Sequence, residues 1–235
     1  MSLRRRSMSA DLTITPIDTG LSLKDKIYDS LKEAITSMNI YSDDAELRLD
    51  ERRLSEQLSI SRTPVREALA RLEQEKLVQI VPRRGVYIVR KTKAEILEML
   101  TVWAALESMS ARLITLNATN DAIASLRSLL TSYSEGQVDD HIDEYSENNI
   151  NFHQAILRMS GNQLICDTAD NLFIHIRSIR ARTIGEEDRA QRSIVDHMQI
   201  VEAIEARDPD LAERLVREHT LNLAKHVDTH VSYLD

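Results

Sequence analysis

Several features are scarce or missing in this 235-residue sequence, and each absence excludes a class of protein. A single cysteine, Cys166, allows no internal disulfide, which fits a reducing compartment and a thiol that fills core space. No stretch reaches the ~18 to 20 apolar residues of a membrane span. Polar residues follow Arg4 to Arg6, where a signal peptide needs an apolar region. We therefore expect a cytoplasmic globular protein.

Helix-breaking residues are rare in the second part of the chain. From residue 94 onward the only glycines and prolines are Gly136, Gly161, Gly185 and Pro209, and no strand alternation is present. This composition predicts an all-α bundle. The expected helices cover residues 94–117, 121–133, 139–159, 162–183, 187–206 and 209–232. The whole chain is thus expected to be mainly α.

Acidic residues are few in the first part of the chain, although the net charge of the whole is −8. Residues 1–93 contain 18 Lys and Arg against 14 Asp and Glu, a balance of +4, whereas residues 94–235 contain 12 against 24, a balance of −12. Contacts with phosphates need a local cationic surface, and an acidic second domain keeps the rest of the molecule off a nucleic acid. The asymmetry favours a nucleic-acid-binding first domain.

The stretch from Leu49 to Val89 carries the clearest functional pattern. Asp50 is placed to cap a helix that begins near Glu51, and Ser61 is placed to cap a second helix with Pro64 in its first turn. Apolar residues spaced by four and three form the buried stripe of the second helix: Val65, Leu69 and Leu72. Cationic and hydroxyl side chains lie on or near the opposite face: Arg62, Thr63 and Arg66.

Two short β-like runs follow, residues 77–81 and 86–89, joined by a turn with two positive charges, Pro82-Arg83-Arg84-Gly85. An amphipathic helix over residues 23–38 is expected to pack beneath. These elements predict a winged helix-turn-helix, whose second helix enters the major groove of DNA. The alternative is a small helical hairpin with a solvated charged face. Residues 1–20 are expected to form a disordered arm, and residues 91–93 a linker.

The string LSEQLSISRTPVREALARLEQEKLV, with PRRGVYIV after it, closely resembles the DNA-binding domain of the GntR family of bacterial transcription regulators. The resemblance implies a winged helix-turn-helix over residues 21–90. It also implies DNA contacts at Arg52, Ser61, Arg62, Thr63 and Arg66, with Gly85 in the wing. Arg62 and Arg66 suit guanine edges, and Ser61 and Thr63 suit phosphates. Because symmetry-related helices contact paired half-sites, we expect a homodimer on a palindromic operator.

Three helices expected in the second domain each carry a histidine near an apolar stripe: His153, His197 and His219. Asn149 precedes His153 by four residues and so shares its helix face. Imidazoles with one oxygen ligand suit Zn²⁺, Ni²⁺, Fe²⁺ or Mn²⁺. The alternative from spacing alone is a set of hydrogen-bonded core histidines.

Residues 94–235 resemble the ligand-sensing domain of the FadR subfamily of GntR regulators, the FCD type. The matching segments are ALESMSARL at 105–113, NINFHQAI at 149–156, DHMQIVEAIEARDPDLA at 196–212 and REHTLNL at 217–223. The resemblance implies a dimerising bundle of six or seven helices that senses a small-molecule effector. It also implies a divalent metal on an Asp and three His, which correspond here to Asn149, His153, His197 and His219.

Two positions depart from that pattern. Asn149 replaces the Asp and brings no negative charge to a metal. Relatives often have an arginine, four residues before the glutamate of the first sensing helix, that helps to hold the carboxylate of an organic acid; here Trp103 precedes Glu107. Arg177 or Arg180 is a candidate replacement, although a solvated surface position is the more ordinary interpretation of either arginine.

These patterns together predict a non-enzymatic, ligand-responsive transcription regulator, a repressor that responds to a small molecule such as an organic acid. One alternative is a metal-free regulator in which the histidines have a structural role. Another is a metalloenzyme fused to a DNA-binding module, since three histidines and an open position can activate water. Against the enzyme, no carboxylate is placed as a clear general base.

Overall fold

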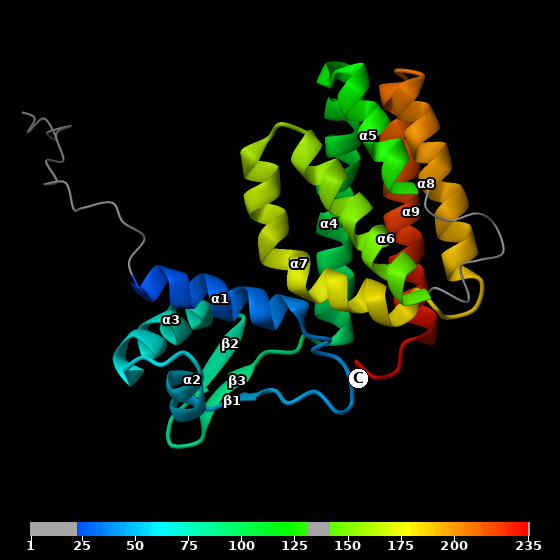
Figure 1. The fold of residues 1–235 in the computed structure, drawn as a ribbon. Helices are drawn as coiled ribbons and strands as arrows, with labels where there is room; N and C mark the ends of the chain where they lie inside the picture. Colours follow the sequence, from blue (N-terminus) through cyan, green and yellow to red (C-terminus); the bar gives the residue numbers. More distant parts are fainter. Residues whose placement is uncertain (1–22, 131–141, 235) are drawn as a thin grey trace, which may run out of the picture.

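The computed structural model describes residues 23–130 and 142–234 of the chain. Within these residues a small N-terminal domain of helices and strands lies against one end of an upright helical bundle (Figure 1). The predicted mainly α architecture is confirmed. The arm expected at residues 1–20 lies outside the described residues.

The N-terminal domain begins with α1 (Leu23–Ser37), α2 (Glu51–Gln57) and α3 (Arg62–Gln74). Asp50 caps α2 as the sequence predicts, because its Oδ1 accepts the backbone N–H groups of Arg52 and Arg53, each at 2.9 Å. Ser61 is the N-cap residue of α3, although its side chain makes no capping hydrogen bond. The apolar stripe of α3 is buried against α1, with Val65, Leu69 and Leu72 at 1% exposure or less.

The sheet of this domain has the order β1-β3-β2 and is antiparallel. The predicted hairpin corresponds to β2 (Val78–Val81) and β3 (Gly85–Ile88), and β1 (Arg48–Leu49) adds a two-residue edge strand. Gly85 pairs with Val81 at the end of the turn and has a φ of 122°, a conformation that favours glycine. The hairpin therefore forms a wing beside α2 and α3.

Six helices make up the described part of the bundle, and their bounds are close to those expected from the sequence. They are α4 (Lys93–Asn117), α5 (Asn120–Leu130), α6 (Ile142–Met159), α7 (Gln163–Thr183), α8 (Arg189–Glu205) and α9 (Pro209–His230). The predicted end of α5 at residue 133 and start of α6 at residue 139 lie outside the described residues. None of the described helices combines the length and apolar character of a membrane span.

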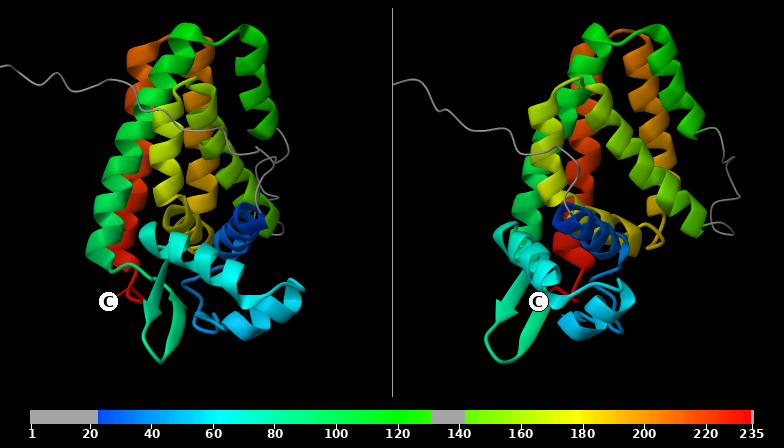
Figure 2. Two further views of the ribbon diagram at one scale, coloured as in Figure 1. Left: turned by 90° about the vertical axis from the view of Figure 1, so that its left-hand side faces the viewer. Right: turned by 60° about the vertical axis from the view of Figure 1, so that its left-hand side comes forward.

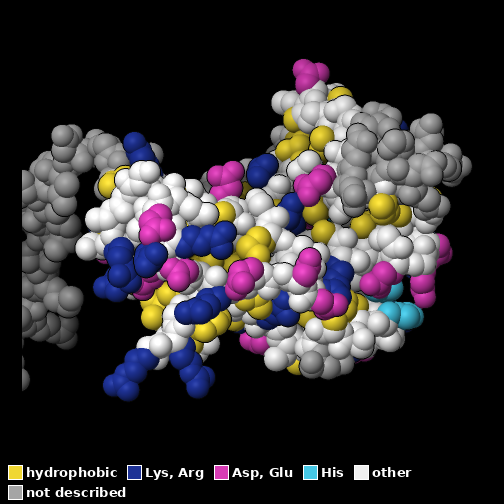
Figure 3. Space-filling view, turned by 60° about the horizontal axis from the view of Figure 1, so that its bottom comes forward, with side chains coloured by type: hydrophobic (Ala, Val, Ile, Leu, Met, Phe, Trp, Pro, Cys, Tyr) yellow, Lys and Arg dark blue, Asp and Glu magenta, His cyan; other side chains and the backbone are white. Residues whose placement is uncertain are grey.

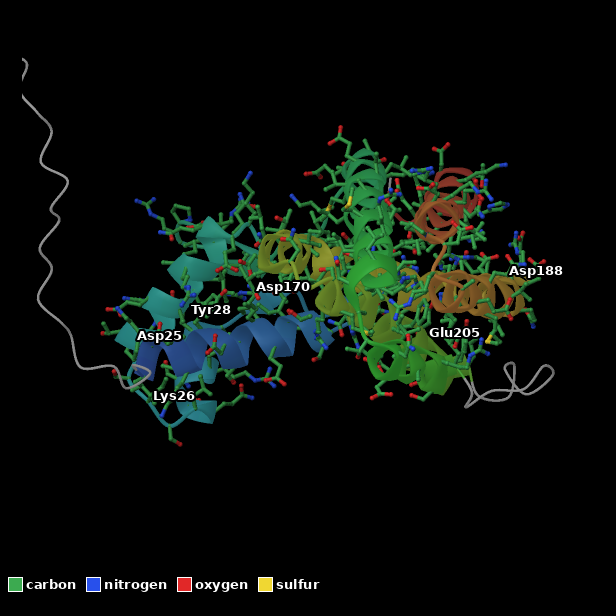
Figure 4. The ribbon with its side chains drawn as sticks, turned by 90° about the horizontal axis from the view of Figure 1, so that it is seen from above. Asp25, Lys26, Tyr28, Asp170, Asp188 and Glu205 are labelled. Carbon is green, nitrogen blue, oxygen red and sulfur yellow. The ribbon has the colours of Figure 1, made fainter. Side chains whose placement is uncertain are left out.

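Helices α4 and α9 run side by side in opposite directions along one side of the bundle (Figures 1 and 2). The ends of α8 are marked by Asp188 and Glu205 in the view down the bundle (Figure 4). The second half of α7 crosses the end of the bundle next to α1 (Figure 1). The apolar core is continuous through this junction, since Ile35 and Leu69 belong to the same buried cluster as Ile179. The two domains are therefore packed together.

Candidate nucleic-acid interface and histidine cluster

The N-terminal half of α3 presents the polar residues that the sequence selects. Ser61, Arg62, Thr63 and Arg66 are all exposed. The Arg66 Nε donates to the Glu51 Oε2 at 2.7 Å, and the Arg62 Nη2 lies 3.5 Å from the same oxygen. One carboxylate of α2 thus holds both guanidinium groups together at the surface. Lys and Arg side chains gather on the N-terminal domain (Figure 3).

The other expected DNA contacts lie on α2 and the wing. Arg52 is exposed and pairs with Glu56 on the same helix at 3.0 Å. Arg83 and Arg84 are exposed at the turn of the wing. A Cβ added to Gly85 would lie 3.4 Å from the Arg48 Nε, so glycine also leaves room for this arginine. The cationic surface of the domain thus extends from α3 to the wing.

The three histidines selected from the sequence meet inside the bundle. His153 comes from α6, His197 from α8 and His219 from α9, and their candidate ligand atoms all lie within 4.8 Å of one another. The Nε2 atoms of His197 and His219 are 3.2 Å apart. Burial lowers the pKa of each imidazole below its ordinary value, so all three are neutral at pH 7.

Two carboxylates hold two of these rings. The Nδ1 of His153 contacts the Oε1 of Glu107 on α4, and the Nδ1 of His219 lies 2.9 Å from the Oδ2 of Asp196 on α8. An ionised carboxylate only accepts hydrogen bonds, so the Nδ1 of His219 carries its proton and the Nε2 presents a lone pair towards the Nε2 of His197. This arrangement, in which a carboxylate fixes the tautomer of a histidine, is common around bound metals.

Arg180 on α7 determines the proton positions at the other end of the cluster. Its Nη1 lies 2.7 Å from the Nε2 of His153. Because a guanidinium only donates, the Nε2 of His153 accepts and the proton of this ring is on Nδ1, directed at Glu107. The Nε of Arg180 is buried without a hydrogen-bond partner among the described residues.

Glu107 is fully buried and surrounded by donors. Its Oε2 accepts the Trp103 Nε1–H at 3.2 Å and the Thr220 hydroxyl at 2.8 Å, and it lies 3.7 Å from the Arg180 Nη2. Burial raises the pKa of this carboxyl, while Arg180 and the two donors oppose the rise. Because the Arg180 guanidinium is its counter-ion and both Trp103 and Thr220 donate to it, we assign the ionised form.

Asn149 lies one helical turn before His153 on α6 and is 2% exposed. Its Oδ1 accepts the Ser193 hydroxyl at 3.3 Å, and the same hydroxyl oxygen is 3.5 Å from the Nε2 of His197. The amide is therefore joined to the cluster through Ser193. Of the four residues selected from the sequence as metal ligands, Asn149, His197 and His219 are linked through Ser193, and the ring of His153 lies beside those of His197 and His219.

Two of the three residues considered for effector binding, Trp103 and Arg180, meet at Glu107, and the third, Arg177, lies elsewhere. Trp103 donates to Glu107 and is 1% exposed. The solvated position favoured for Arg180 is wrong, because this side chain is 3% exposed and lies within the cluster, where Glu107 and His153 pair with it. Arg177 lies instead at the junction with α1, where its Nη1 is 3.3 Å from the carbonyl oxygen of Thr36.

Sequence reasoning did not select Glu107 or Asp196 as site residues. Glu107 had a signal, since it follows Leu100 and Trp103 by seven and four residues and so places a charge within the apolar stripe of α4. Asp196 had none, because an acidic residue beside a histidine on a polar helix is ordinary. Both carboxylates hold a histidine Nδ1.

A cavity of about 240 Å³ between α8 and α9 opens at the surface beside the cluster. Ser193 and His219 are among its lining residues, so the cavity borders the histidine cluster at His219. Positive side chains at the cavity include Arg189, Arg192 and Lys225, with Glu187 and Asp196 as negative ones. Histidine side chains also reach the surface on the side away from the N-terminal domain (Figure 3). A small charged molecule would fit this opening.

A winged helix-turn-helix with exposed arginines, packed against a bundle that encloses a polar site, defines a transcription regulator that binds DNA. Residues 23–88 match the family of bacterial regulatory proteins called gntR, and residues 98–222 match the FCD domain. The chain belongs to the GntR family, and its helical bundle is an FCD domain.

The relatives agree with this assignment. The HTH-type transcriptional repressor RspR of Escherichia coli K12 is 27% identical over 179 residues, which cover 76% of this chain and 78% of the relative. The Uxu operon regulator of Haemophilus influenzae is 30% identical over 210 residues, which cover 82% of this chain and 77% of the relative. The solved structure of E. coli McbR/YncC has the same fold, with a TM-score of 0.72 at 23% identity over 90% of this chain and 99% of that one.

Proposed function

We propose that this protein is a ligand-responsive repressor that binds a palindromic operator as a homodimer and senses an anionic small molecule in a metal-containing histidine cluster. The observation that carries the proposal is the buried cluster itself, in which neutral imidazoles converge beside a cavity that opens to solvent. The names of relatives such as RspR and the gluconate operon repressor of Bacillus licheniformis favour repression. As with other bacterial transcription regulators, the cytoplasm is the expected compartment.

The proposed DNA contacts rest on the exposed arginines of α3. Arg66→Ala should lose about 1 to 3 kcal/mol of operator binding and relax specificity at one base position. Glu51→Gln is the matched variant. It removes the negative charge of the carboxylate that holds Arg66, a charge that would face the DNA phosphates. The affinity of this variant for the operator should therefore equal or exceed that of wild type.

The operator for this experiment is obtained by selecting random duplexes with the full chain. Binding is then measured by fluorescence anisotropy at several salt concentrations. An Arg66→Ala protein with the operator affinity of wild type would refute this role for α3.

The proposed metal rests on the donor set. The Nε2 lone pair of His219 faces the Nε2 of His197 at 3.2 Å, and the buried Nδ1 of His197 has no partner among the described residues. If the proton of His197 is on Nδ1, two imidazole nitrogens are directed at one point, which suits Zn²⁺, Ni²⁺, Fe²⁺ or Mn²⁺. His153 would join them, with Asn149 as an oxygen donor. A bound metal would supply an open coordination position for the carboxylate of a ligand.

Elemental analysis of protein purified without chelator tests the metal. Wild type should hold about one ion per chain, as expected for one four-residue site, and His197→Ala should hold none. His230→Ala is the control, because that ring is half exposed and pairs with Glu187 outside the cluster. A metal-free wild type that still binds its operator would favour the alternative of a purely structural histidine cluster.

The cavity indicates the chemistry of the effector. Arg189 is largely buried in its wall, where burial lowers its pKa to about 10, and Lys225 lies at the same opening. Cations beside a histidine cluster favour a small organic acid. Operator release in the presence of a panel of carboxylic acids, compared between wild type and Arg189→Met, tests this assignment.

The proposed dimer is supported by an apolar stripe on α4. Val102, Met109 and Leu116 are spaced by seven residues and are 46%, 44% and 57% exposed. A regular row of exposed apolar side chains marks an interaction surface. Val102→Glu with Met109→Glu should yield monomers in analytical ultracentrifugation, and an unchanged dimer would place the interface elsewhere.

A further inference from the structure

Helix α7 contacts the histidine cluster with one face and the DNA-binding domain with the other. Arg180 enters the cluster, as described above. His175, Ser178 and Arg182 are spaced by three and four residues and therefore share the opposite face. The side chain of each of these three residues contacts the segment between α1 and β1.

Tyr41 is the centre of this contact. Its hydroxyl lies 2.8 Å from the Nδ1 of His175 and 3.1 Å from the backbone nitrogen of Lys91 in the linker. Burial lowers the pKa of His175 to about 4, so this ring is neutral, and the Tyr41 hydroxyl can donate to it while accepting the Lys91 N–H. The guanidinium of Arg182 donates to the carbonyl oxygen of Tyr41.

The C-terminus of α1 is held by the same helix. The Nη1 of Arg177 is 3.3 Å from the carbonyl oxygen of Thr36 and 3.4 Å from that of Ser37, and the Ser178 hydroxyl is 3.5 Å from that of Met38. The last carbonyl groups of a helix lack partners within the helix and carry its negative dipole end, so an arginine is well suited to bind them. Through α1, this contact reaches α3, which packs on α1.

We propose that α7 couples the histidine cluster to the DNA-binding domain through Arg180. The inference rests on the ligand-responsive function proposed above. Any group that takes the Nε2 lone pair of His153, a metal included, removes the acceptor of the Arg180 Nη1. A buried guanidinium that loses an acceptor must find another partner or reach water. Because Arg180 is part of a continuous helix, its displacement moves the face that holds Tyr41 and the end of α1.

Hydrogen–deuterium exchange of the full chain tests the coupling without knowledge of the effector or operator. Arg180→Met keeps the length of the side chain and removes its donors, and it should speed exchange of residues 36–42 by about tenfold, as expected for the loss of a stabilising hydrogen bond. Arg158→Met is the control, since Arg158 is exposed on α6, the helix of His153. Faster exchange around His153 with no change at residues 36–42 would overturn the proposal.

A second variant approaches the coupling from the other side and preserves the bundle. Tyr41→Phe removes one hydroxyl outside the bundle, and because coupling is reciprocal it should speed exchange in both α7 and residues 150–156. A change confined to residues 36–42 and 91 would contradict the proposal. Titration of chelator-treated wild type and Tyr41→Phe with Zn²⁺ adds a separate measurement. Absence of zinc binding to wild type would refute the metal site, while the exchange results would still decide the coupling.

Discussion

Replacement of Glu107 by glutamine gives the most direct test of the charge assignment in the cluster. The substitution keeps the size and shape of the side chain and removes only its negative charge. If the carboxyl is ionised, Glu107→Gln leaves the guanidinium of Arg180 without its counter-ion at 3% exposure. The glutamine amide has only one acceptor oxygen, which can face only some of the donors around it. Its NH₂ group then faces the remaining donors and cannot accept from them.

The magnitude follows from burial. Removal of one partner of a buried ion pair costs about 3 to 5 kcal/mol. The control is Glu205→Gln, the same chemical change in a surface pair whose oxygens accept from the Arg127 Nε at 2.7 Å and Nη2 at 2.6 Å. Its side chains are about one-third exposed, and such pairs contribute about 0 to 1 kcal/mol. The two substitutions should therefore differ by several kcal/mol.

Urea denaturation of the full chain, followed by circular dichroism, measures the free energy of unfolding of the three proteins. A protonated Glu107 would be nearly isosteric with glutamine and equally uncharged. Equal effects of the two substitutions, within the roughly 0.5 kcal/mol scatter of surface changes, would therefore refute the ionised assignment.

Three further outcomes are expected. His175 has a folded pKa of about 4, below its ordinary value of 6.5, so folding releases its proton. The stability it contributes is complete above pH 6.5 and is lost as the pH falls towards 4, by about 3 kcal/mol at most; His175→Asn should flatten this part of a pH series of urea midpoints. Asp196→Asn should weaken metal binding by about 10- to 100-fold, because the tautomer of His219 is no longer fixed, and a competitive chelator titration measures the change. Phe152→Ala should cost about 3 to 5 kcal/mol of unfolding free energy, since this fully buried ring stacks on His197, whereas an effect below 1 kcal/mol would contradict the packing.

Most of the secondary structure could be predicted because local signals agreed with tertiary packing. The scarcity of glycine and proline, together with cap residues such as Asp50 and Asp208, located helix ends to within a few residues. The pairing of the two-residue strand β1 with β3 could not be predicted, because the two strands lie almost forty residues apart in the sequence. Ser61 is the N-cap residue of α3, but its side chain makes no capping hydrogen bond. Whether such a bond forms depends on local geometry that the composition does not specify.

The sequence predicted which histidines form the cluster, but not the contacts that these histidines make with other side chains. Spacing and resemblance selected His153, His197 and His219, which lie together. The burial of Arg180 was missed, since an arginine on a long helix is usually solvated, and only the fold places Glu107 opposite it. Arg177, three residues earlier, faces the other domain. Helical spacing alone does not distinguish these two environments.

Trp103 is the only tryptophan in the chain, and its indole N–H donates to the same oxygen of Glu107 that accepts from Thr220. The ring is almost completely buried and stacks on Phe173 at a centroid distance of 6.4 Å and an interplanar angle of 26°. A single indole fixed to the central carboxylate is an intrinsic optical probe. Its emission under selective tryptophan excitation should change whenever charge or occupancy changes at the cluster, so candidate effectors can be screened by fluorescence, without a label and before any operator is known.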